Sequence, residues 1–195
     1  SKELTNKDKF FLNFCIENKV DFVGISFVDK ADYLKEINNF IGESNLKAIA
    51  KIENSDAITN LSEILEISYA IMIDRGDLSV ETNPSSIAIL QKRILHEANN
   101  FGVPVIVATE MLHSMQESIL PTKAECNDIT NSVLDGASCL MLSGETAVGN
   151  NPNESVKTIK SIIDLTRQYI LDKNNTSLEN IDNNQIGQAD VMAAS

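Results

Sequence analysis

The sequence has few of the residues that build disulfide frameworks or zinc sites, since it contains three cysteines and two histidines among 195 residues. Cys15, Cys126 and Cys139 are an odd number and lack the short spacing of metal ligands. They fit packing residues in a reducing compartment better than a set of disulfides. His96 and His113 have no cysteine or second histidine at ligand spacing along the chain, so we expect no zinc site.

The sequence also lacks a long apolar run and an excess of positive charge. No run approaches the roughly 18 to 20 apolar residues of a membrane-spanning helix, and residues 1–10 are too polar for a signal peptide. The 28 acidic and 16 basic side chains give a net charge of −12, which argues against nucleic acid and membrane partners. Because 43% of the residues are apolar, the chain can bury a core. We therefore expect a soluble, cytoplasmic protein.

Short apolar, β-branched runs alternate with longer stretches of helical periodicity, which is typical of βα units. The strands are predicted at residues 22–26, 47–53, 70–75, 103–109 and 139–143. The helices are predicted at residues 6–18, 31–40, 57–67, 86–101, 122–134 and 153–172. Strands 70–73 and 103–108 are apolar on both faces, as in a parallel sheet that is covered on both sides. The pattern predicts an α/β fold with a parallel sheet.

The predicted βα units end at residue 172, where the composition changes. Residues 173–188 are rich in asparagine, serine, threonine and aspartate and are predicted to be a linker. Residues 189–195 resemble the start of a further helix. We therefore predict one domain over residues 1–172, followed by the linker and the beginning of a second domain.

Each predicted strand is apolar until its carboxyl end, where polar groups follow. These groups are Ser26, then Lys51 and Glu53, then Asp74 to Asp77, then Thr109, then Ser143 and Glu145. In parallel α/β folds and in closed barrels, ligands bind at the carboxyl edge of the strands. The pattern indicates that the functional residues lie at this edge.

Two adjacent strand ends carry the side chains for a cation site. Lys51 and Glu53 are two residues apart on a strand, so both point to the same face, where a simple salt bridge is the alternative interpretation. Asp77 ends the next strand and adds a second carboxylate. Two carboxylates with room for water and phosphate oxygens suit Mg²⁺, whereas solvated loop acids are the plain alternative.

The same edge has candidate anion-binding and hydroxyl groups. Gly76, next to Arg75, lets backbone N–H groups approach a small carboxylate or phosphate, although a turn glycine between charges is an equal alternative. Thr109 and Ser143 are either part of a site or simple capping residues. The sequence has neither a Walker-type glycine-rich loop nor a dinucleotide fingerprint, so any nucleotide binds in another way.

These segments resemble, in order and spacing, the signature segments of pyruvate kinases. The resemblance runs from about Leu4 to Asp172. It is carried by IAKIEN (49–54), IMIDRGDL (71–78), ATEML (108–112) with Ser114-Met115, PTKAE (121–125) and MLSGETA (141–147). In that family the catalytic domain is a (β/α)8 TIM barrel with a small inserted domain and a C-terminal regulatory domain. The resemblance implies that this chain is a partial barrel that holds strands four to eight with their helices.

The resemblance also implies an activity, which is phosphoryl transfer from phosphoenolpyruvate to ADP in the last step of glycolysis. Glu53 and Asp77 would then bind Mg²⁺ or Mn²⁺, and Lys51 would neutralise charge on the phosphoryl group and the enolate. Arg75, Gly76 and Asp77 would bind substrate. Thr109 would lie beside the carbon that is protonated, and Ser143 and Glu145 would feed a proton relay.

The resemblance further implies K⁺, at a site outside this segment, and a homotetramer for the full-length protein. We expect the 195-residue segment to be inactive alone and the full-length enzyme to be active. A non-catalytic regulatory paralogue and a metal-dependent pyruvate or phosphoenolpyruvate lyase are the alternatives. Asp74 stands where the family has a small residue and Glu110 where it has glutamine. These acids would either tighten cation binding or repel the anionic substrate.

Overall fold

The computed structural model describes residues 3–193, and the side chains as far as Lys173. Within these residues five parallel strands form one sheet, and each strand is hydrogen-bonded to the strand that follows it in sequence. The strands are β1 (Phe22–Ile25), β2 (Lys47–Ile52), β3 (Ala70–Asp74), β4 (Val105–Ala108) and β5 (Cys139–Met141). The structure therefore confirms the α/β class and the parallel sheet.

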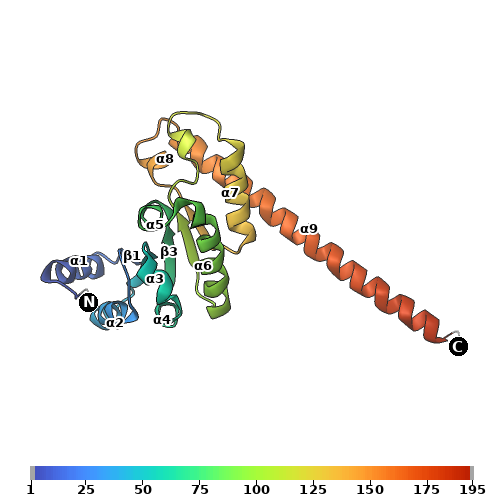
Figure 1. The fold of residues 1–195 in the computed structure, drawn as a ribbon, viewed down its shortest axis with the longest axis horizontal. Helices are drawn as coiled ribbons and strands as arrows, with labels where there is room; N and C mark the ends of the chain where they lie inside the picture. Colours follow the sequence, from blue (N-terminus) through green and yellow to red (C-terminus); the bar gives the residue numbers. More distant parts are fainter. Residues whose placement is uncertain (1–2, 194–195) are drawn as a thin grey trace.

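Helices connect successive strands, as the alternating sequence pattern predicts (Figure 1). They are α1 (Asn6–Glu17), α2 (Ala31–Ile41), α3 (Ser55–Thr59), α4 (Leu61–Leu65), α5 (Arg75–Glu81), α6 (Ile87–Phe101), α7 (Lys123–Leu134), α8 (Gly144–Ala147) and α9 (Pro152–Ala193). Two short 3₁₀ turns, η1 (Pro84–Ser86) and η2 (His113–Gln116), lie between them. Thr5 and Thr122 begin α1 and α7 with capping boxes, in which each threonine side chain exchanges hydrogen bonds with an acid three residues later.

Several predicted bounds differ from the structure, and two of these differences change the number or type of the elements. The helix predicted over residues 57–67 is two helices, because Asn60 leaves the helical conformation and donates its side-chain amide to the carbonyl of Asp29 at 2.8 Å. The strand predicted over residues 70–75 ends at Asp74, and Arg75 instead begins α5. Helix α5 has seven residues, which is too short for a clear helical period in the sequence.

The main core lies between the helices and one face of the sheet. Because side chains alternate along a strand, Ala50, Ile52, Ile71, Ile73 and Val107 all point to this face and are fully buried. The helices contribute buried residues to the same core, among them Leu34, Ile37, Leu61, Ile64, Ile94 and Leu95. This packing fixes the register of the strands, and so it fixes the position of the residues at their carboxyl ends.

The opposite face of the sheet has a separate, small apolar cluster. Ile49, Ala70, Met72 and Ala108 form it, with Ile106 and Met141 packed against them. Lys51 and Asp74 occupy the next positions of the same alternation on β2 and β3, toward the carboxyl ends. The apolar cluster therefore lies on the same face of the sheet as the charged residues and next to them along the strands.

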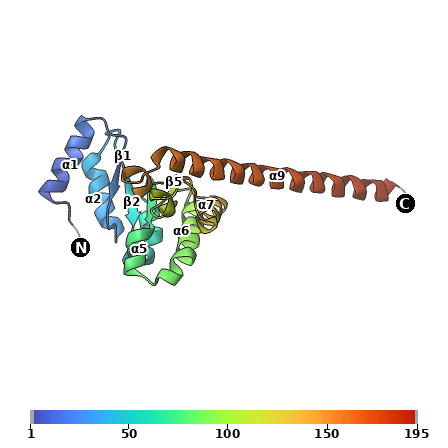
Figure 2. The same ribbon diagram turned by 90° about the horizontal axis from the view of Figure 1, so that it is seen from above.

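Helix α9 begins at Pro152 and contacts α7 and α8 (Figures 1 and 2). Proline suits the first position of a helix, where its missing N–H has no intrahelical partner to lose. Helix α9 continues past the predicted helix end at residue 172 to Ala193, through the predicted linker at residues 173–188. The division into a domain, a linker and the start of a second domain at residues 189–195, which extend beyond the described residues, stays a prediction. Among the described residues, no helix combines the length and the apolar character needed to cross a membrane.

Candidate functional site

Lys51 lies at the centre of a charged cluster at the carboxyl ends of β2 and β3. Its Nζ is 2.5 Å from Glu53 Oε1 and 3.1 Å from Asp74 Oδ2, and it donates to Ser26 Oγ at 3.5 Å. The side chain is 19% exposed. Burial lowers the pKa of Lys51, but the hydrogen bonds and charges of Glu53 and Asp74 outweigh it and raise the pKa above its ordinary value. The side chain is therefore held as a cation.

Glu53 follows β2 and is fully buried. Its Oε2 accepts the backbone N–H of Phe27 at 2.5 Å, and Phe27 has a φ of +54°, which non-glycine residues rarely adopt. Its Oε1 contacts Lys51 Nζ but has no partner in good hydrogen-bonding geometry among the described residues. Glu53 therefore has one oxygen fixed by the backbone and one oxygen held by charge alone.

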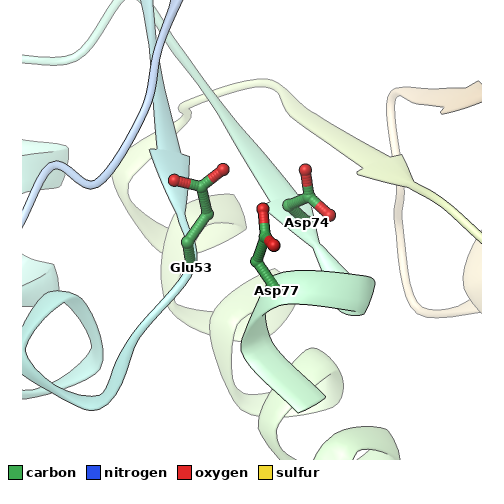
Figure 3. A group of neighbouring side chains, drawn as sticks. All are labelled: Glu53, Asp74 and Asp77. Carbon is green, nitrogen blue, oxygen red and sulfur yellow. The ribbon is translucent and has the colours of Figure 1, made fainter. Parts of the chain in front are cut away.

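Two further carboxylates lie next to Glu53. Asp74 ends β3 and is buried, while Asp77 projects from the first turn of α5 and is exposed (Figure 3). Glu53, Asp74 and Asp77 each have an oxygen within 4.8 Å of the others. Opposite ligand oxygens around Mg²⁺ are about 4 Å apart, because each lies about 2.1 Å from the ion. Neighbouring ligand oxygens are about 3 Å apart, so the three carboxylates supply the oxygen donors that suit a small divalent cation and would move closer together around it.

Thr109 connects the cluster to the next strand end. Its Oγ1 accepts the backbone N–H of Gly76 at 2.9 Å, donates to the carbonyl of Ala108 at 2.6 Å and lies 3.4 Å from Asp74 Oδ1. Its backbone has a φ of +69°, and Glu110 follows with +54°. These two left-handed residues turn the chain sharply after β4 and bring the Thr109 hydroxyl to the start of α5.

Arg75 holds this turn in place. The side chain is 8% exposed, and its Nε and Nη2 donate to the carbonyl of Thr109 at 3.2 and 2.7 Å. Nη2 also donates to the carbonyl of Glu110 at 2.9 Å, and Nη1 forms an ion pair with Asp128 of α7 at 2.5 Å. The sequence predicts Arg75 as a substrate-binding residue, but its three guanidinium nitrogens all have partners within the chain.

Ser143 and Glu145 form a second group of contacts. Glu145 is 1% exposed, its Oε1 accepts the N–H of Leu112 at 2.9 Å and its Oε2 accepts the N–H of Ser143 at 2.9 Å. Burial raises the pKa of Glu145, but these backbone N–H groups and the Coulomb interaction with His113 outweigh it and lower the pKa. No hydrogen bond joins Ser143 or Glu145 to Thr109 or Lys51 in the part of the chain that the structure describes.

The predicted site residues thus fall into two neighbouring groups. Lys51, Glu53, Gly76, Asp77 and Thr109 come together around Asp74, whereas Ser143 and Glu145 connect β5 to the segment after β4. Asp74, which stands where the family has a small residue, was expected either to tighten cation binding or to repel the anionic substrate, and it lies at the centre of the first group. The sequence reasoning missed Phe27 and Asp128, which support Glu53 and Arg75, because no local sequence pattern connects residues that are 26 and 53 positions apart.

Comparisons with known proteins connect this geometry to one family. A family model described as "Pyruvate kinase, barrel domain" matches residues 1–156. The chain is 45% identical over 161 residues to a pyruvate kinase of Dictyostelium discoideum, covering 82% of this chain and 32% of that protein. It is 43% identical over 162 residues to a pyruvate kinase of Staphylococcus saprophyticus, covering 82% of this chain and 28% of that protein. The chain therefore spans about a third of the length of these relatives.

Proposed function

The chain belongs to the pyruvate kinase family, and on this basis we propose that it carries part of an active site that transfers a phosphoryl group from phosphoenolpyruvate to ADP. The phosphoryl group leaves the enol oxygen of phosphoenolpyruvate for a terminal phosphate oxygen of ADP. The enolate that remains takes a proton at carbon and becomes pyruvate. The five parallel strands correspond, in this proposal, to strands four to eight of an eight-stranded barrel in a polypeptide of the relatives' length.

The observation that carries the proposal is the cluster around Lys51. An ammonium group and three carboxylates meet at the carboxyl ends of two adjacent parallel strands, where α/β enzymes bind their ligands. Transfer of a phosphoryl group requires positive charge near its oxygens and near the leaving oxygen. This cluster has both a cation of its own and oxygen donors for a second one.

Glu53 and Asp77 are the proposed ligands for Mg²⁺ or Mn²⁺. A divalent cation bound there would supply positive charge to the substrate and to the transferring phosphoryl oxygens. Lys51 would place its ammonium against the phosphoryl group and the developing enolate, where a preorganised charge has its largest effect on the barrier. Phe27 keeps Glu53 in position through its backbone N–H.

In this proposal, hydroxyl groups deliver the proton that the enolate carbon takes up. By family resemblance Thr109 would lie beside the carbon that is protonated, and in this structure its hydroxyl accepts the Gly76 N–H and lies 3.4 Å from Asp74 Oδ1. Ser143 would pass on the proton, and Glu145 would fix the segment that presents the Ser143 hydroxyl. The N–H groups at Gly76 and Asp77 would bind the substrate carboxylate, with the Gly76 N–H exchanging its present partner Thr109 for the substrate.

Arg75 has a supporting role in this proposal. Its guanidinium connects the Thr109–Glu110 turn to α7, so it would keep the Thr109 hydroxyl in place for the substrate. K⁺, the remainder of the nucleotide site and the tetramer interface belong, by family resemblance, to a polypeptide longer than this chain. The 195-residue chain alone is expected to lack activity.

A non-catalytic, regulatory relative is the second candidate. The buried Asp74, which places a further negative charge 3.1 Å from Lys51, favours it, because the acid competes with an anionic substrate for the ammonium. Calorimetry on the polypeptide of the relatives' length separates the two candidates. A regulatory relative should bind neither Mg²⁺ nor phosphoenolpyruvate, whereas the enzyme should bind both.

The direct test is pyruvate formation from phosphoenolpyruvate and ADP with Mg²⁺ in the polypeptide of the relatives' length. We expect Lys51→Ala to lower kcat by at least about 100-fold, the usual effect of removing a group that stabilises transition-state charge. Lys47→Ala is the matched control, because Lys47 lies on the same face of β2 as Lys51 but at the opposite end of the strand. The activity of this variant should equal that of the parent polypeptide. An inactive parent polypeptide, or equal activity of the two variants, would overturn the proposal.

A further inference from the structure

Asp74 contacts two of the proposed catalytic residues at once. Its Oδ2 lies 3.1 Å from Lys51 Nζ, and its Oδ1 lies 3.4 Å from Thr109 Oγ1. The side chain is 11% exposed and stands at the end of β3, directly before the helix that carries Asp77. The carboxylate is therefore fixed within the cluster and contacts the same ammonium group as Glu53.

The two oxygens of Glu53 are not equivalent. Oε2 accepts the N–H of Phe27, so it is already used by the backbone. Oε1 is buried, lies 2.5 Å from the Lys51 ammonium and accepts no hydrogen bond in good geometry among the described residues. Oε1 is thus the oxygen that Glu53 can offer to a cation, and Lys51 occupies that position.

A divalent cation and the Lys51 ammonium repel each other at contact distance, and burial strengthens that repulsion. Binding of the cation to Glu53 Oε1 therefore requires Lys51 to move away from this oxygen. Asp74 Oδ2 is the second carboxylate oxygen already within 3.1 Å of Lys51 Nζ. This oxygen offers the ammonium an alternative partner within the cluster, so Lys51 need not move into solvent.

We propose that Asp74 is a positioning residue that holds Lys51 at the β2–β3 edge while Glu53 binds a divalent cation. This inference rests on the cation site of the proposed function. Asp74 makes the cation site easier to fill by accepting Lys51, and it keeps the ammonium within reach of a bound phosphoryl group. It does so through Lys51 and not as a ligand of the cation.

The test is a double-mutant cycle on the affinity for Mn²⁺, measured as free Mn²⁺ by electron paramagnetic resonance in the polypeptide of the relatives' length. Asp74→Asn should weaken Mn²⁺ binding by about tenfold when Lys51 is present, within the usual range of coupling energies between contacting groups. With Lys51→Met, which removes the ammonium, the same Asp74→Asn change should weaken binding by less than about threefold, because Glu53 Oε1 is then unoccupied. Lys51→Met alone should tighten binding.

Asp21→Asn is the matched control, because it removes the same charge just before β1 at the opposite edge of the sheet, and it should leave Mn²⁺ affinity unchanged. Asp74→Ala replaces Asp74→Asn if the latter does not fold, as judged by circular dichroism. If Asp74→Asn lowers Mn²⁺ affinity equally with and without Lys51, then Asp74 acts as a direct ligand or through its charge alone. If it does not lower the affinity at all, then Asp74 has no role in cation binding. Either result overturns the inference but leaves the cation site intact. Failure of the parent polypeptide to bind Mn²⁺ overturns the inference and the proposed function together.

Discussion

The molecule uses carboxylates in two different ways. Around Lys51, Glu53 and Asp74 contact one ammonium group, and a third carboxylate, Asp77, has an oxygen within 4.8 Å of theirs. After β4, Glu125 and Glu145 accept N–H and hydroxyl groups on both oxygens, from Ser114 and Thr122 in one case and from Leu112 and Ser143 in the other. The second arrangement satisfies each carboxylate by itself, whereas the first needs another positive charge.

The difference separates residues that hold the fold from residues that hold a ligand. A backbone N–H is fixed and always available, so a carboxylate bound to it is stable whether or not a ligand is present. Like charges at close range are unfavourable, and functional sites commonly keep such a conflict that a ligand relieves. The Lys51 cluster should therefore contribute little to the stability of the ligand-free protein, while Glu125 and Glu145 should contribute much.

The largest effect on stability is expected at Glu145. Glu145→Ala leaves the buried N–H of Leu112 and the partly buried N–H of Ser143 without their acceptor, which should lower the free energy of unfolding by about 3 kcal/mol. Thermal or urea unfolding measures this loss. Glu117→Ala, at an exposed position of the same region, is the control and should change stability by less than about 0.5 kcal/mol. A Glu145 variant as stable as this control would contradict the division into two kinds of carboxylate.

The sequence predicted which residues gather around Lys51 better than it predicted the contacts that hold Glu145 and the Thr109–Glu110 turn in place. Period-two alternation put Lys51 and Glu53 on one face, and the parallel sheet brought Asp77 and Thr109 to the same edge. No sequence periodicity indicates which donor groups a carboxylate will bind. Whether Glu145 faces a proton relay or the N–H of Leu112, 33 residues away, depends on the packing of two loops.

The left-handed turn at Thr109 and Glu110 shows the same limit. Neither residue is a glycine, so the sequence contains no local sign of a positive φ. The turn exists because Arg75 donates to both carbonyls, and Arg75 is itself held by Asp128. A conformation that depends on tertiary contacts in this way is readable only once those contacts are known.

A second, smaller effect is expected on acidification. Burial raises the pKa of Glu125 and of Glu145, but the N–H and hydroxyl donors of Ser114 and Thr122, and of Leu112 and Ser143, lower each pKa below the ordinary 4.5. Carboxylates with a lowered pKa stabilise the fold above pH 4.5, and this contribution is lost as the pH falls through their folded-state values. The melting temperature, recorded at decreasing pH from neutral, should therefore decrease once the pH is below 4.5.

The same measurement on Glu125→Gln assigns the effect. Glutamine does not titrate, so this variant should start less stable at neutral pH and lose less on acidification than the parent protein. Asp56→Asn, at an exposed position on α3, is the control and should leave the pH profile unchanged. If Glu125→Gln loses as much stability on acidification as the parent protein, other carboxylates cause the loss. Those of the Lys51 cluster would be the first to test.

The smallest effect on stability is expected at Asp77, because two opposing contributions meet there. Asp77→Asn removes one of three crowded carboxylates, which stabilises the ligand-free protein, but it also removes a negative charge from the first turn of α5, which destabilises the helix. Each contribution is of the order of 0.3–1 kcal/mol, so the free energy of unfolding should change by less than about 0.5 kcal/mol. Mn²⁺ affinity should nevertheless fall by about tenfold, because one proposed ligand is neutralised. Glu81→Gln, at the other end of α5, is the control and should leave Mn²⁺ affinity unchanged. A large loss of stability in Asp77→Asn without a loss of Mn²⁺ affinity would place Asp77 with Glu145, among the carboxylates that hold the fold.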